Sequence, residues 1–135
     1  YWNQQLIAES LGKKGKGFLP LISNAPKDHH SLLQLYLDGP RDKFFEIYSS
    51  DYNESNDFIN ITLSNHKEAM IKTLKSESLP IIKVDNYEVE NNKKILSQLG
   101  YIFSNSIIEA LLLAELGGVD PFGQDAVEKQ KNFLK

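Results

Sequence analysis

The sequence of 135 residues contains no cysteine, which excludes a disulfide framework, a thiolate nucleophile and a zinc–thiolate site. A cysteine-free chain is typical of a reducing compartment, and we expect a cytoplasmic protein. A strong excess of one charge is also lacking, because the net charge is −3 and the lysines are spread along the chain. Nucleic acid is therefore not expected as the main partner.

Long hydrophobic runs are absent as well. The longest, residues 107–114, is interrupted by Glu109 and is too short to cross a membrane. We therefore expect a buried helix of a soluble protein and no membrane partner. With 41% hydrophobic residues, the chain is long enough for a single domain over residues 1–135. Because it starts at Tyr1 without an initiator methionine, we interpret it as a fragment of a longer chain.

Hydrophobic periodicity predicts an alternation of helices and short strands. Helices are predicted over residues 2–11, 28–38, 65–75, 91–116 and 124–134. Strands are predicted over residues 18–22, 43–48 and 80–84, and residues 59–63 form either a third strand or an extended connector. This order predicts an α/β fold with helices on both faces of a mainly parallel sheet. The long helix carries a predicted buried stripe of Ile95, Leu99, Ile102, Phe103, Ile107, Ala110, Leu111 and Ala114.

Two adjacent histidines, His29 and His30, stand at the start of the second predicted helix, which Asp28 is expected to cap. An imidazole there can exchange a proton near neutral pH. A histidine at a helix start is also common as a structural hydrogen-bonding group. Position alone leaves both interpretations open.

Two further pairs combine an amide with an ionisable group. Gln5 and Glu9 are four residues apart, and Gln124 and Lys131 are seven apart, so each pair is expected to share a helix face. Each pair could present both groups to one ligand, although such spacing is also common by accident.

The basic segment 12–17 (Gly-Lys-Lys-Gly-Lys-Gly) has some features of a phosphate loop. It lacks the Gly-Lys-Ser/Thr end and follows a helix where the phosphate loop requires a strand. We interpret it as a mobile basic turn and not as a nucleotide site.

Three blocks, taken together, resemble the C-terminal half of the glucose-6-phosphate isomerase family, within the sugar isomerase (SIS) superfamily. Residues 4–13 resemble the family's Gln-containing helix that ends in Glu-Ser-x-Gly-Lys, and residues 28–39 resemble its histidine helix. Residues 121–131 resemble its C-terminal Phe-x-Gln-x-x-Val-Glu-x-x-Lys block. The blocks keep their order and span nearly the whole chain. The family often has Asn, Gln and Asp where this sequence has Leu11, His29 and Gly123.

The resemblance implies a three-layer α/β/α sandwich with a mainly parallel sheet (SIS-type, flavodoxin-like). It implies an aldose–ketose isomerase that interconverts glucose 6-phosphate and fructose 6-phosphate through ring opening and an enediol, without metal or organic cofactor. By block position, Glu9 matches the base that moves a proton between C1 and C2. His30 matches the ring-opening histidine, Lys131 the assisting lysine, and Gln5 and Gln124 substrate-contacting glutamines. The bulky pair and glutamine that follow at fixed spacing favour His30 over His29.

The resemblance also implies what lies outside this sequence. The family's phosphate-gripping Ser/Thr segment and its catalytic arginine belong to an N-terminal SIS domain of the same parent chain, so this fragment alone is expected to be inactive. The family is dimeric, and we expect a homodimer. An alternative is a non-catalytic SIS-type module that binds a sugar phosphate and regulates another protein. A third is a structural interaction domain, which leaves the coincidence of Glu9, His30 and Lys131 unexplained.

Overall fold

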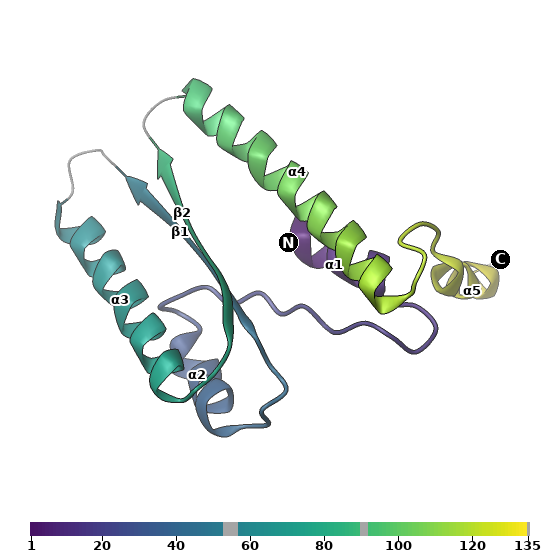
Figure 1. Ribbon diagram of the computed structural model, residues 1–135, viewed down its shortest axis with the longest axis horizontal. Helices are drawn as coiled ribbons and strands as arrows, with labels where there is room; N and C mark the ends of the chain where they lie inside the picture. The colour runs from purple at the N-terminus through teal and green to yellow at the C-terminus, as the bar shows by residue number, and fades with distance from the viewer. Residues whose placement is uncertain (53–56, 90–91, 135) are drawn as a thin grey trace. The chain divides into compact units, whose positions relative to one another are not determined.

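The structure is a computed structural model that describes residues 1–52, 57–89 and 92–134 (Figure 1). The chain folds into two compact units, which divide within one long helix. The terminal unit contains residues Tyr1–Ile22 and Leu99–Lys135, and the central unit contains Ser23–Gln98.

In the terminal unit, helix α1 (Trp2–Leu11) packs against the C-terminal part of helix α4 (Asn92–Gly117). The contact is built from residues four apart on each helix, which lie on one face at helical spacing. The small side chains of α4 allow the larger ones of α1 to approach closely. The buried cluster consists of Ile7, Leu11, Ala110, Ala114 and Val119. The rings of Trp2 and Phe103 extend the same contact, with centroids 4.6 Å apart.

Helix α4 ends in a glycine turn that returns Val119 to this core. The backbone N–H of Val119 donates to the carbonyl of Ala114, and that of Gly118 donates to the carbonyl of Glu115. Gly118 has a φ of +62°, the left-handed conformation that such a helix ending requires. The Lys16 Nζ donates to the carbonyl of Gly117 at 2.8 Å, so a cation also satisfies the negative end of the helix.

The predicted buried stripe of α4 is confirmed at only part of its length. Ala110 and Ala114 are buried against α1, whereas the large stripe residues Leu99, Phe103, Ile107 and Leu111 are exposed. In the described part of the chain, the buried cluster on α4 extends no further toward its N-terminus than Ala110. By length and composition alone, Lys94–Gly117 is long and apolar enough to cross a membrane, with a mean hydropathy of 1.4. The expectation that the protein has no membrane partner therefore stays a prediction.

The central unit is built around two parallel strands. Strand β1 (Phe45–Tyr52) pairs with β2 (Ile81–Val89), and helix α3 (Asp57–Ser76) lies between them in sequence and runs beside both (Figure 1). The register pairs Phe45 with Ile81 and, after an irregularity, Glu46 with Lys83. A parallel pair joined through a helix confirms the predicted α/β class. The sheet has two strands in the described residues.

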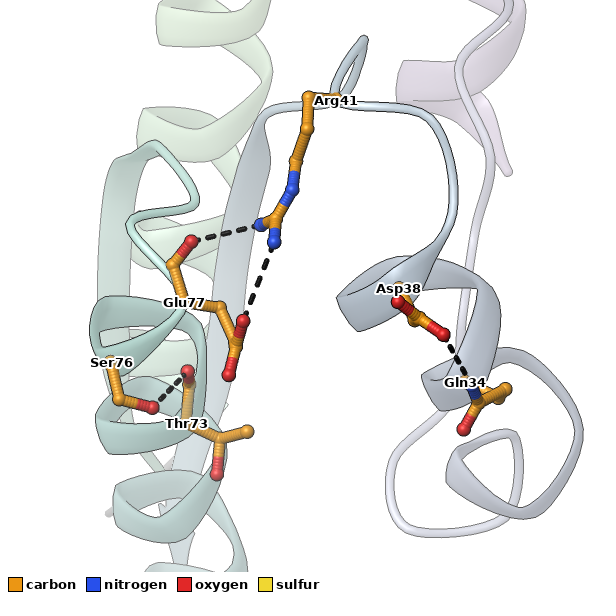
Figure 2. Close-up of polar contacts among 6 residues, drawn as sticks. All are labelled: Gln34, Asp38, Arg41, Thr73, Ser76 and Glu77. Carbon is orange, nitrogen blue, oxygen red and sulfur yellow. Dashed lines mark hydrogen bonds and ion pairs between the residues drawn. The ribbon is translucent and has the colours of Figure 1, made fainter.

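Helix α2 (His29–Asp38) belongs to this unit, and the C-terminal part of the helix contacts strand β1. The ring of Tyr36 meets that of Phe45 edge to face, with centroids 5.4 Å apart. Just beyond α2, Arg41 bridges to the end of α3, where its Nη1 donates to the carbonyl of Glu77 at 2.8 Å and its Nη2 lies 3.4 Å from the Glu77 carboxylate (Figure 2). Gln34 and Asp38 are joined within α2 in the same view.

The predicted strand at residues 18–22 and the predicted strand or extended connector at residues 59–63 are both wrong. Residues 18–22 form no strand, and the carbonyl of Pro20 accepts a hydrogen bond from Gln4 Nε2 at 2.7 Å. Residues 59–63 lie inside α3, which begins eight residues before the predicted helix of residues 65–75. Within α3 the Thr62 hydroxyl donates to the carbonyl of Phe58 at 2.7 Å, so the helix satisfies its polar group.

Candidate functional site

Helix α1 presents Gln5 and Glu9 on one face, as their spacing predicts. The Gln5 Nε2 donates to Oε1 of Glu9 at 2.9 Å, and both side chains are exposed. Another face of the helix is anchored by the buried side chains of Ile7 and Leu11. The carboxylate is thus held by an amide on a helix that the core fixes in place.

Just after α1, the side chain of Lys13 contacts the turn that precedes α5 (Asp125–Phe133). The Lys13 Nζ donates to the carbonyl of Asp120 at 2.6 Å and to that of Phe122 at 2.8 Å. These acceptors lie 107 and 109 residues away in the sequence. One ammonium group therefore joins the block that carries Gln5 and Glu9 to the block that carries Gln124 and Lys131. In the basic segment, which the sequence predicts to be a mobile turn, Lys13 and Lys16 both donate to backbone carbonyls.

The turn before α5 has an internal hydrogen bond of its own. Oδ1 of Asp120 accepts from the backbone N–H of Phe122 at 2.9 Å, and Gly123 follows with a φ of +79°. Gln124 then stands at the N-cap of α5 with φ −144° and ψ 49°, outside the helix. The helix predicted over residues 124–134 thus begins one residue later, so Gln124 stands at its N-cap and Lys131 lies within it.

Lys131 lies in the last turn of α5. Its Nζ is 2.5 Å from Oε1 of Glu128, and both side chains are about 60% exposed. None of the residues Asp125–Phe133 is buried in the described structure. The ammonium is therefore paired within its own helix and faces solvent, where a substrate could displace the pairing at small cost, since exposed pairs contribute little.

The two histidines begin α2. His29 is half-buried and His30 is exposed. Asp28 stands at the N-cap position as predicted, but it makes no side-chain cap. Its Oδ2 accepts instead from the backbone N–H of Asn24 at 2.7 Å, so the carboxylate stabilises the turn that leads into the helix. His30 is therefore the more exposed of the two histidines.

The structure brings four of the five predicted site residues into one unit. Gln5, Glu9, Gln124 and Lys131 belong to the terminal unit, and His30 belongs to the central unit. The sequence does not predict the contacts of Lys13, which ends the Glu-Ser-x-Gly-Lys block. Its partners are backbone carbonyls, which no side-chain pattern in the sequence indicates.

A hollow of about 170 Å³ lies in the terminal unit and contains none of the predicted site residues. It is lined by Leu11, Lys16, Gly17, Phe18, Leu113, Gly117 and Val119. Across the described ranges no group of three or more His, Asp or Glu is arranged to hold a metal ion. The expectation that no metal or cofactor is needed stays a prediction.

The chain is similar in sequence to proteins of one name. No family model matches the chain. It is 33% identical over 147 residues to the glucose-6-phosphate isomerase of Methanocaldococcus jannaschii, a match that covers 98% of this chain and 35% of that protein. It is 31% identical over 152 residues to the glucose-6-phosphate isomerase of Rubrobacter xylanophilus, which it covers to 34%, again with 98% of this chain. The chain spans about a third of the length of the curated relatives that it matches.

A solved structure shares the fold. A hypothetical protein of Thermus thermophilus superposes with a TM-score of 0.77 at 22% identity, over 98% of this chain and 36% of that one. The match shows that the arrangement of elements described above occurs within a larger protein. It carries information on the fold alone.

Proposed function

We propose that this chain is the C-terminal part of a glucose-6-phosphate isomerase, in which it interconverts glucose 6-phosphate and fructose 6-phosphate. The observation that carries the proposal is the joining of two family-like blocks by Lys13, in a chain that matches isomerases over 98% of its length. The carboxylate of Glu9, the amides of the two glutamines and the ammonium of Lys131 thereby occur in one folded unit.

Glu9 is the proposed base for the enediol step. A carboxylate that takes the proton from C2 of the aldose and returns it to C1, while a hydroxyl proton moves from O2 to O1, converts aldose to ketose, and the reverse order runs the reaction backward. The Gln5 amide holds Oε1 of Glu9, so we assign the proton transfer to Oε2. Gln5 and Gln124 would also donate to sugar hydroxyls, and amides placed there stabilise negative charge that develops on the enediolate.

His30 and Lys131 are the proposed ring-opening groups. Opening the pyranose requires a donor for the ring oxygen and an acceptor for the anomeric hydroxyl proton, which imidazole and ammonium can supply. Both side chains are exposed in this chain and so are accessible to a sugar. The half-buried position of His29 favours His30 for this role.

The site is completed by parts outside this chain. We propose an N-terminal SIS domain of the same parent chain, which supplies the phosphate grip, and a homodimer; the isolated chain would then be inactive. The two parallel strands would belong to the larger sheet of a three-layer α/β/α sandwich, because parallel sheets are covered on both faces. The exposed apolar side chains Tyr48 and Ile82 on these strands support that expectation. We propose a cytoplasmic enzyme that requires no metal or organic cofactor.

The test is turnover by the full-length protein. A coupled assay that follows glucose 6-phosphate formation from fructose 6-phosphate should show catalysis in the presence of a chelator. A non-catalytic regulatory module would instead bind fructose 6-phosphate, measured by calorimetry, without turning it over. That result would replace the isomerase by the regulatory alternative.

A further inference from the structure

We propose that Lys13 is a positioning residue for this reaction, which fixes the turn carrying Gln124 against the end of the helix carrying Glu9. This rests on the proposed function. Lys13 lies two residues beyond the end of α1, and its ammonium bonds to two carbonyls of the segment that immediately precedes Gln124. Lys13 itself is not expected to contact substrate.

The two hydrogen bonds of the Lys13 ammonium are suited to holding the turn in place. A hydrogen bond from an ammonium is shorter and stronger than one between neutral groups, and the 2.6 and 2.8 Å contacts fit that class. A single bond would leave the turn free to swing about it, whereas two acceptors on one ammonium fix both its distance and its direction. Lys13 itself is half-buried, whereas its two hydrogen bonds lie at the exposed surface.

The position of the turn determines the position of Gln124. The turn is stabilised internally, because Oδ1 of Asp120 accepts a hydrogen bond from the backbone N–H of Phe122. Gly123 follows in a left-handed conformation, and the next residue is Gln124 at the start of α5. A displacement of the Phe122 carbonyl therefore reaches Gln124 within two residues.

Lys16 provides a matched control. It belongs to the same basic segment, and its Nζ also donates to a backbone carbonyl in the terminal unit, that of Gly117 at 2.8 Å. This acceptor is the end of α4, ahead of the Asp120 turn. Removing either ammonium deletes a charge and a link to the same region, but the carbonyls beside Gln124 are lost only with Lys13.

The experiment measures kcat and KM for fructose 6-phosphate in the full-length protein. Lys13→Met should lower kcat/KM about tenfold to a hundredfold, the range that a misplacement of the order of an ångström causes. Lys16→Met should stay close to wild type. Lys13→Arg, which keeps several donors, should restore part of the loss. In a Gln124→Ala background, Lys13→Met should add little, because its effect acts through Gln124.

Wild-type kcat/KM in Lys13→Met, equal losses in both lysine variants, or additive losses in the cycle with Gln124 would overturn the positioning role. Should Lys13→Met fail to fold, the cycle is run with Lys13→Arg, whose residual loss must also vanish in the Gln124→Ala background. A wild-type protein that binds fructose 6-phosphate without turnover overturns the proposed function, and a positioning role in that reaction falls with it.

Discussion

Val119 donates its backbone N–H to the carbonyl of Ala114 at 2.9 Å, and both side chains lie in the buried cluster of the terminal unit. The hydrogen bond and the apolar contact together close the last turn of α4. They also set the direction in which the chain leaves the helix toward Asp120, and so the place where Lys13 finds its acceptors.

Gly118→Ala should therefore destabilise this ending. A Cβ at Gly118 would meet the Lys16 Nζ at 3.5 Å, an ordinary contact, so the cost comes from the φ of +62°. We expect a loss of about 1 kcal/mol, measured by chemical denaturation of the full-length protein. Gly100→Ala, within α4 itself, is the control, because open space surrounds the new Cβ there. It should stabilise by about 0.5–1 kcal/mol, and a loss at Gly100 equal to that at Gly118 would show that the φ is not the cause.

The link between Arg41 and Glu77 predicts unequal effects for its two partners (Figure 2). The stronger contact is to the Glu77 carbonyl at 2.8 Å, whereas the carboxylate is 3.4 Å away and about half exposed. Arg41→Met should lower the free energy of unfolding by about 1 kcal/mol, and Glu77→Gln by less than about 0.5 kcal/mol. Equal losses would assign the link to the ion pair and not to the carbonyl.

Substitution of His30 and of His29 should have different effects on the turnover rate. In the full-length protein, His30→Ala should slow turnover of the cyclic sugar phosphate about a hundredfold, the usual contribution of an acid–base group. An open-chain substrate analogue bypasses ring opening and should be affected far less. His29→Ala should leave both rates near wild type. Equal losses in the two variants would contradict the assignment to His30.

Much of the fold follows from local pattern. The helices at residues 2–11 and 91–116 are confirmed within a residue, because their apolar spacing and flanking glycines agree. The prediction fails at residues 59–63, where Ile59, Ile61 and Thr62 favour a strand but lie in α3. Local propensity is a weak guide where a longer helix extends through such residues.

The candidate site was predictable only in part. The Gln5–Glu9 contact follows from helical spacing, because both partners lie within one helix. The Lys13 contacts do not, because they join residues more than a hundred positions apart and end on backbone carbonyls. The side chain of Asp28 was expected at the helix N–H groups but bonds to Asn24, since a short carboxylate can satisfy a turn as readily as a helix end.

The central claim is that Glu9 moves the proton between C1 and C2, and Glu9→Gln in the full-length protein tests it most directly. The substitution keeps the shape of the side chain and removes its basicity; Glu115→Gln, at an exposed position on α4, is the control for the change in charge. The measurement is the exchange of the C2 proton of glucose 6-phosphate with solvent, together with calorimetric binding of the sugar phosphate. We predict that exchange falls by about 10²–10⁴-fold while binding persists. Exchange at the wild-type rate in Glu9→Gln would contradict the account.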